Sequence, residues 1–426
     1  MVTPYLLRSP SLFTGDQLES IESATYAVLA QIGLAVRNDE LRERLRRAGV
    51  PETDGRYRIE KRRAEAFIAA TRQRSGNAFT LEPQPPSNAD RPLTAMPGTY
   101  QLKEYDSDSG AVVPFTAERI ARGTKLVHSY AGEGLVGSNI GLPDDVGGAL
   151  ALVAQYWLAA TFSRQGRSPA DSQDPAAFQY IFDMAAALGA PIDSRNVYLI
   201  SPLVIGGESL QIVLDFERHL NRVSLHSMPA AGVTGPVFPG DAYAVAAAEV
   251  IGGAILLQDV LDCDVEWTVA LFHADFRSMA MVYGSPEFFT MELASRQLDA
   301  FLHGRTWSPL MGNIHSLAEA PGAQACAERA SIMTAGALLG ERFFASLGVL
   351  SADEMFSAEQ LVYDMEIKDH VQGMVRGLPL SCDTDRCLAD TRAALRAGGF
   401  VSLDSTLMNF GDLYWHPATL NRTYHG

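Results

Sequence analysis

The sequence has few groups of the kinds that mark disulfide-bonded, zinc-binding or nucleic-acid-binding proteins. Only four of its 426 residues are cysteine. Cys382 and Cys387 form the one close pair, so we expect free thiols in a cytoplasmic protein rather than a disulfide framework or a zinc site. Basic residues are also scarce, because 34 lysines and arginines stand against 50 aspartates and glutamates, a formal net charge of −16. That charge argues against a nucleic-acid partner.

Membrane and export signals are lacking as well. Residues 1–13 have neither the basic start nor the long apolar run of a secretory signal. The longest apolar stretch, residues 242–257, is interrupted by Glu249 and is short for a bilayer. We therefore expect a buried core helix there and no membrane association.

Motifs for metal, nucleotide or acid–base chemistry do not occur in a usable context. The nine histidines are scattered, without HExxH spacing, and no nucleophile elbow is present. Residues 132–137 spell the dinucleotide fingerprint GEGLVG, but a helix-like stretch precedes them and a strand-like one follows. The fingerprint needs the opposite order. We expect neither a tightly bound metal nor a bound nucleotide.

What the sequence does contain is an alternation of apolar strands and buried helices, with 47% hydrophobic residues overall. This alternation over about 300 residues predicts a (β/α)8 barrel, the TIM-barrel form of the α/β class, with an N-terminal helical extension. The predicted division is 1–95 for the helical region and 96–426 for the barrel. The candidate strands are 135–140, 197–205, 223–228, 266–272, 306–311 and 343–347; the candidate helices are 149–160, 176–188, 210–221, 242–257, 287–302, 323–339 and 357–374. Residues 161–172 are polar where a second barrel strand is expected.

The N-terminal region carries clear helix signals. Thr14 and Gln17 fit a capping box at the start of one helix, and Asn38 fits the cap of a second. A third helix is predicted over residues 60–73. Residues 77–97 are rich in proline and asparagine and indicate a linker.

The stretch 224–258 organises the barrel half of the chain. A short apolar strand leads into a loop with three glycines and three prolines, and a long apolar helix follows. In parallel α/β folds, ligands bind at the loops that follow the carboxyl ends of strands. The composition of this loop suits close approach of a bulky ligand to the backbone.

Several collinear segments resemble one enzyme family. They are SMPAAGVTGPV at 227–237, Tyr283-Gly-Ser-Pro-Glu287, Ala323-Gln-Ala325 with Glu328, and the run 356–362 followed by Asp364 and Glu366. Together they resemble the trimethylamine methyltransferase family, over nearly the whole chain. No residue of this chain is pyrrolysine, and the corresponding run is Gly312-Asn-Ile-His-Ser316. The chain is therefore similar to the pyrrolysine-free branch, which includes glycine betaine methyltransferases.

The resemblance implies an activity and a site. The implied enzyme moves a methyl group from a small quaternary amine to the cob(I)alamin of a separate corrinoid protein. The expected reacting-site residues are His315 and Asn313. The expected substrate-binding residues are Tyr100, Asn139, Ser201, Tyr283, Trp307 and Gln324, since aromatic faces hold quaternary ammonium groups. Met228, Gly232, Thr234 and Gly235 are the residues expected to face the corrinoid.

Two departures from the family pattern leave alternatives open. Gly322 stands where the family has aspartate, and Ser405-Thr-Leu407 stands where it has His-Thr-Leu. The alternatives are a methyltransferase with another acceptor, such as a folate, and a non-catalytic amine-binding homologue. The aromatic C-terminal tail, 410–424, predicts packing on the barrel or on a second subunit, and hence a homo-oligomer.

Overall fold

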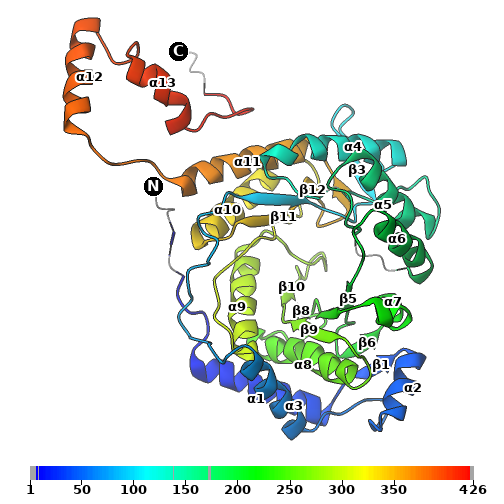
Figure 1. Cartoon of the computed structure of the whole chain (residues 1–426). Helices are drawn as coiled ribbons and strands as arrows, with labels where there is room; N and C mark the ends of the chain where they lie inside the picture. Colours follow the sequence, from blue (N-terminus) through cyan, green and yellow to red (C-terminus); the bar gives the residue numbers. More distant parts are fainter. Residues whose placement is uncertain (1–5, 8, 138, 171–173, 423–426) are drawn as a thin grey trace.

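The strands form a ring surrounded by helices (Figure 1). The computed structural model of the chain describes residues 6–7, 9–137, 139–170 and 174–422. On one side of the ring, β5 (Ser194–Tyr198), β7 (Arg222–His226) and β9 (Asp264–Thr268) pair in parallel and in unbroken register. On the other side, β11 (Phe343–Leu347) pairs in parallel with β2 (Thr94–Pro97). This pairing joins the last strand of the ring to the first, which confirms the predicted barrel.

Single parallel bridges extend the second arc. Leu135 pairs with Ala95, and Asn313 pairs with Ala345. The predicted strand 306–311 is wrong, because no strand forms there. Pro309 lacks a backbone donor, and only Asn313, beyond Gly312, joins the sheet.

The helices that follow the strands cover the ring from outside. Seven of them match the predicted segments, with ends that differ by a few residues: α5 (Leu150–Phe162), α6 (Pro175–Ala187), α7 (Glu208–Phe216), α8 (Pro239–Gln258), α9 (Pro286–His303), α10 (Ala323–Leu339) and α11 (Ala358–Arg376). Helix α4 (Ala117–Ser129) is not among the predicted segments. Two large core clusters fill the space between strands and helices, one centred on α8 and one on α10 and α11.

Helix α8 is the predicted core helix. It is long and apolar enough to cross a membrane, but nearly all of it is enclosed by the protein. It packs on α1 (Gly15–Gln31) from the N-terminal region. Small residues make the close approach possible: a Cβ on Gly252 would lie 2.7 Å from Leu29 of α1. Burying its leucine and isoleucine side chains contributes about 1.5–3 kcal/mol for each.

The N-terminal extension follows the predicted signals. Thr14 and Gln17 form the capping box of α1, and Asn38 caps α2 (Asp39–Arg47) through the backbone N–H of Leu41. Helix α3 is Lys61–Arg74, and β1 (Ala35–Arg37) pairs with β6 (Val204–Gly206). The extension therefore adds a parallel pair on the outside of the ring.

Three predicted segments divide differently. The predicted strand 266–272 spans the end of β9 and the start of a separate strand, β10 (Phe272–His273), and residues 269–271 belong to neither. The predicted strand 197–205 is β5 and β6, separated by a tight loop in which Ile200 and Val204 pair with each other. The last four residues of the predicted linker are β2, a strand that its proline-rich surroundings conceal. The division near residue 95 stays a prediction.

The chain also has elements that the alternating pattern does not reveal. A small sheet combines β3 (Lys103–Asp106) and β4 (Ala111–Pro114) with β12 (Val349–Leu350) and β13 (Met355–Phe356). Helices α12 (Thr384–Ala397) and α13 (Asp404–Leu413) project from the end of α11, away from the ring (Figure 1). The tail returns to α11, where the Trp415 ring lies 4.8 Å from that of His370; Tyr424 lies outside the described residues.

Candidate active site

The inside of the barrel is hollow and polar. In β7, Val223 and Leu225 pack outward against α8, so Ser224 and His226 face the inside. The same alternation directs Asn196 and Glu266 inward, and the His226 ring nitrogen lies 3.2 Å from the Asn196 amide oxygen. The barrel therefore offers a polar channel where many barrels have packed apolar layers.

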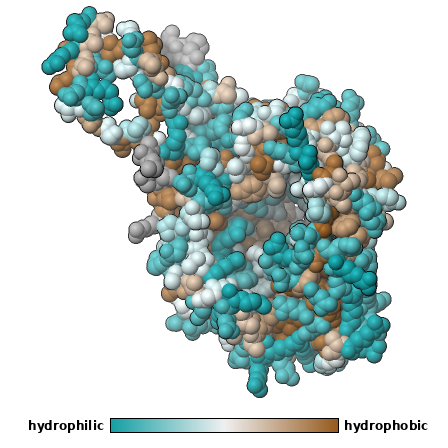
Figure 2. Space-filling model, in the orientation of Figure 1, coloured by the Kyte–Doolittle hydropathy of each residue, from teal (hydrophilic) through white to brown (hydrophobic). Residues whose placement is uncertain are grey.

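The exposure of side chains on the barrel strands also indicates a hollow interior. Tyr198, Ile200, Met228 and Phe343 lie in or directly after barrel strands, yet each is 37–44% exposed. A cavity of about 660 Å³ opens at the amino ends of β5, β7 and β9, lined by Asn196, Ser224, Arg222 and Glu266 among others. Figure 2 shows a hollow in the middle of the visible face. A small ligand fits in the cavity at the amino ends of the strands.

His315 lies at the opposite, carboxyl end of the strands, in a set of close contacts. Its Nδ1 makes a short hydrogen bond to the Asn313 amide oxygen, and its Nε2 lies 3.0 Å from the Ser346 hydroxyl. The Asp353 carboxylate is 3.5 Å from the same Nε2. The Tyr283 ring stands over the imidazole, with centroids 4.9 Å apart. These contacts fix the imidazole plane from three sides.

Tyr283 supplies an aromatic face at this position. Its ring packs edge-on against Phe272 and Phe288, at 6.1 and 5.5 Å. Burial, together with the nearby carboxylates Asp353 and Glu292, raises the pKa of Tyr283 to about 12. The phenol therefore stays neutral, and its ring can face a cation.

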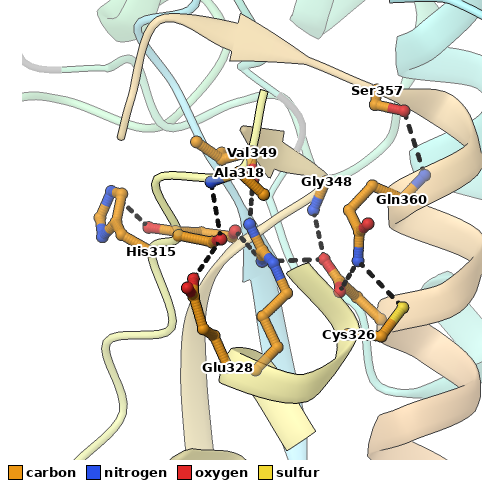
Figure 3. Close-up of polar contacts among 12 residues, drawn as sticks. His315, Ala318, Cys326, Glu328, Gly348, Val349, Ser357 and Gln360 are labelled. Atoms are coloured by element: carbon orange, nitrogen blue, oxygen red, sulfur yellow. Dashed lines mark hydrogen bonds and ion pairs between the residues drawn. The ribbon is translucent and has the colours of Figure 1, made fainter. Parts of the chain in front are cut away.

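A polar framework lies behind His315 (Figure 3). Ser316 donates a 2.5 Å hydrogen bond to Glu328, which also accepts from Gln324 at 2.9 Å. Gly284 lies close to the same carboxylate. Its φ is +73°, and a Cβ there would lie 2.9 Å from Glu328. Only glycine suits that position. Gln324 and Glu328 thus support the loop rather than line the channel.

The second part of the framework is an ion pair with no solvent contact. Arg329 lies 2.9 Å from Asp364, and both side chains are fully buried. Asp364 also accepts from the Gly348 N–H and from Gln360, each at 2.7 Å, while Arg329 donates to the Ser346 carbonyl at 2.9 Å. Burial raises the pKa of Asp364 and lowers that of Arg329, and the pairing opposes both shifts. The pair fixes residues 346–349, and through them the hydroxyl that meets His315.

The glycine-rich loop forms a compact turn at the same end of the barrel. β8 (Ala230–Ala231) pairs in parallel with β10 (Phe272–His273). The Thr234 hydroxyl accepts a hydrogen bond from the Ala230 N–H, and the Gly235 carbonyl accepts one from Gly232. Met228, just before the turn, is 44% exposed. The turn is partly covered by a large side chain, because the exposed ring of Phe276 lies over Gly232.

Three further predicted residues, Ser201, Trp307 and Asn139, make their hydrogen bonds to groups other than His315. Ser201 donates to Glu249, a carboxylate of α8 that also accepts from the Leu203 N–H, both at 2.8 Å, so it secures a loop. Burial raises the pKa of Glu249. Trp307 is buried and donates to the carbonyls of Thr80 and Leu81 in the linker.

Asn139 donates a hydrogen bond to the Ser168 carbonyl, where it links two neighbouring wall segments. Its amide oxygen is buried and has no hydrogen-bond partner among the described residues. Tyr100 is partly buried, and its place at the site stays a prediction.

Sequence reasoning missed Ser346, Asp353 and Arg329. Their signal in the sequence is weak, because Ser346 lies at an irregular point of β11 where its φ is positive, and Asp353 lies in a turn beyond β12. Arg329 directly follows Glu328, a residue of a family motif within α10. A fully buried arginine is rare, and here it is buried because it pairs with the equally buried Asp364.

Comparison with known proteins matches this arrangement to one family. The family profile described as trimethylamine methyltransferase (MTTB) matches residues 166–425. The chain belongs to the trimethylamine methyltransferase family. The match spans more than half of the chain and includes His315, its framework and the glycine-rich loop, which confirms the resemblance seen in the sequence.

Individual family members are similar over different lengths. Trimethylamine methyltransferase MttB of Methanosarcina barkeri (strain Fusaro / DSM 804) is 28% identical over 203 residues, 47% of this chain and 40% of that protein. The chain thus aligns with about two fifths of that relative. Glycine betaine methyltransferase of Desulfitobacterium hafniense (strain Y51) is 24% identical over 434 residues, 98% of this chain and 88% of that protein. The crystal structure of the Methanosarcina barkeri monomethylamine methyltransferase (MtmB) has a TM-score of 0.49 at 12% identity, covering 93% of this chain and 82% of that chain.

Proposed function

We propose that the protein is a methyltransferase that takes a methyl group from a small quaternary amine and passes it to the cob(I)alamin of a separate corrinoid protein. The observation that carries the proposal is the family match over residues 166–425, on a barrel that is hollow and has Tyr283 and His315 at its carboxyl end. The nearly full-length similarity to a glycine betaine methyltransferase supports a quaternary donor.

The chemistry suits a site without an evident acid–base pair. A quaternary ammonium has neither a lone pair nor a proton to transfer. The cobalt(I) nucleophile supplies the electron pair for the new cobalt–carbon bond, and the electrons of the broken carbon–nitrogen bond stay on nitrogen. The amine therefore leaves neutral, without needing a proton. What the enzyme must supply is orientation and a pocket for a cation.

In this proposal the substrate cation lies against Tyr283, with Asn313 and His315 holding its polar end. The compact turn 230–235 is the surface that the corrinoid approaches, and Phe276 lies at its edge. A reducing cytoplasmic setting suits both the cobalt(I) acceptor and the four cysteines, which are free thiols.

The test is a single-turnover reaction under anaerobic conditions. The purified protein is mixed with cob(I)alamin and, in turn, with glycine betaine, choline and tetramethylammonium, and the loss of the cob(I)alamin absorption band is followed. We expect loss of the band with at least one donor. No loss with any of them, together with methylation of tetrahydrofolate, would mean that the acceptor is a folate. Binding of a donor without transfer to either acceptor would mean a non-catalytic amine-binding protein.

A further inference from the structure

One face of α9 is directed at the barrel wall where the wall is not hydrogen-bonded. Within the described residues, neither β9 nor β10 forms a ladder with residues 306–311. Phe288, near the start of α9, contacts the rings of Tyr283 and Phe272, and Asp299, three turns later, accepts from the Val269 N–H just after β9. Glu292 lies between them on the same helical face, one turn after Phe288.

Glu292 is a carboxylate with no hydrogen bond or ion pair to any residue that the structure describes. The other carboxylates near His315 are engaged. Asp353 accepts from Gln101 at 2.9 Å and lies against His315, and Glu341 accepts from the N–H groups of Arg342 and Phe343 at 2.7 and 2.9 Å. Glu292 alone among the three keeps its oxygens free for a ligand.

Two groups of the candidate site, His315 and Tyr283, interact electrostatically with Glu292, together with Arg296 one turn further along α9. Burial is the largest influence on Glu292 and raises its pKa; Arg296 and His315 act in the opposite direction, and Glu341 raises it further. Glu292 in turn raises the pKa values of Tyr283 and Tyr243. Glu292 is partly buried. A carboxylate that has lost part of its hydration and has no bonded partner is unfavourable by itself, and a cation placed beside it relieves that cost.

We propose that Glu292 is the residue that selects a positively charged methyl donor: the onium group lies between its carboxylate and the face of Tyr283, in reach of His315. The inference rests on the proposed function and adds the chemical basis of its donor selectivity. An aromatic ring alone attracts a cation weakly, whereas a partly buried carboxylate without another partner discriminates between a cation and a neutral molecule of the same shape.

The experiment compares a cation with its neutral isostere. Choline and 3,3-dimethylbutan-1-ol differ only in having nitrogen or carbon at the quaternary centre. Their binding to the full-length protein and to Glu292→Gln is measured by titration calorimetry. Glu287→Gln is the matched control, because Glu287 is on the same helix but exposed on its first turn. Circular dichroism confirms that each variant is folded, and Glu292→Asp tests whether a displaced carboxylate restores part of the affinity.

We expect Glu292→Gln to weaken choline binding at least about tenfold, while binding of the neutral isostere stays unchanged or improves. Glu287→Gln should behave as the parent protein, and Glu292→Asp should fall between. The inference is overturned if Glu292→Gln binds choline as the parent does, or if the parent does not prefer choline to its isostere. A parent protein that shows Glu292-dependent choline binding but no methyl transfer would keep the cation site and disprove the methyltransferase proposal. Methyl transfer from a quaternary amine that is unaffected by Glu292→Gln would keep the methyltransferase proposal and disprove the cation site.

Discussion

The Ser346 hydroxyl lies 3.0 Å from Nε2 of His315, and the backbone carbonyl of the same serine accepts a hydrogen bond from the fully buried Arg329. The imidazole at the mouth of the barrel is thus connected to an ion pair in the core. A site that acts by orientation needs such support, because a misplacement of about 1 Å can lower a rate about a hundredfold.

The first prediction concerns His315. His315→Ala should lower methyl transfer to cob(I)alamin at least about a hundredfold, because the substrate loses its polar anchor and Tyr283 its ring partner. Ser346→Ala should have a smaller effect, mainly on kcat, since the imidazole stays but is less well held. His219→Ala is the control, as His219 is exposed on the outside of the barrel. An active, folded His315→Ala protein would remove His315 from the site.

A second prediction concerns the glycine turn. Gly232 has a φ of +81°, and a Cβ there would lie 2.4 Å from the Phe276 ring. Gly232→Leu should strain the turn and displace Phe276, raising the KM for cob(I)alamin by about tenfold or more while leaving choline affinity nearly unchanged. Gly240→Leu is the control, since no atom lies within 4 Å of the Cβ position there. Equal losses of cob(I)alamin and choline binding would show that the turn does not serve the acceptor alone.

The partly buried carboxylate of Glu292 leads to a pH-dependent prediction. Burial raises the pKa of Glu292 in the folded state above its value in the unfolded state. The favourable contribution of this carboxyl to the stability of the folded protein is therefore fully present below the unfolded pKa, and it is lost as pH rises through the folded pKa. Glu292→Gln, which is neutral at every pH, should therefore be more stable than the parent at neutral pH. The difference should vanish near and below the unfolded pKa of about 4.3. Urea unfolding at several pH values, without ligand, measures it; a variant less stable than the parent at neutral pH would contradict the assignment.

The projecting C-terminal helices predict a homo-oligomer. Leu380, Leu395, Val401 and Met408 are each 79–89% exposed on this part of the chain, and two helices cannot bury such side chains by themselves. Light scattering at micromolar concentration should show more than one copy. Leu395→Glu with Met408→Glu should dissociate the assembly, whereas Arg396→Glu should not. A monomeric parent protein would refute the prediction.

Much of the fold follows from patterns that the sequence displays. The long helices are predictable because their caps and apolar runs are strong, as with Thr14 of α1 and Asp174, Ser285 and Ser357 at the starts of α6, α9 and α11. The barrel strands are less predictable from the sequence. β2 is short and surrounded by prolines, and the wall near Asn313 is joined by a single bridge. Such segments gain their structure from neighbours distant in the chain, and local pattern cannot reveal them.

The residues of the candidate site likewise include some that the sequence predicts and others that only the tertiary structure reveals. His315, Asn313 and Tyr283 come from segments with a family pattern, and the structure brings them together. Ser201 and Trp307 are also near strand ends, but their hydrogen bonds go to Glu249 and to the linker, and only tertiary structure decides that. Glu292 could not be found from sequence, because a glutamate in the middle of a helix is usually solvated. Its importance appears only once α9 is seen against an unpaired part of the barrel wall.

The most direct test of the central claim follows the methyl group itself. Glycine betaine carrying three deuterated N-methyl groups is incubated with the protein and cob(I)alamin without oxygen, and both products are analysed by mass spectrometry. The account predicts one deuterated methyl on the corrinoid for each molecule of dimethylglycine formed, and it predicts a strong decrease in both products with His315→Ala. Dimethylglycine without a deuterated methyl on the corrinoid, or no reaction of any quaternary amine in the presence of active cob(I)alamin, would contradict it.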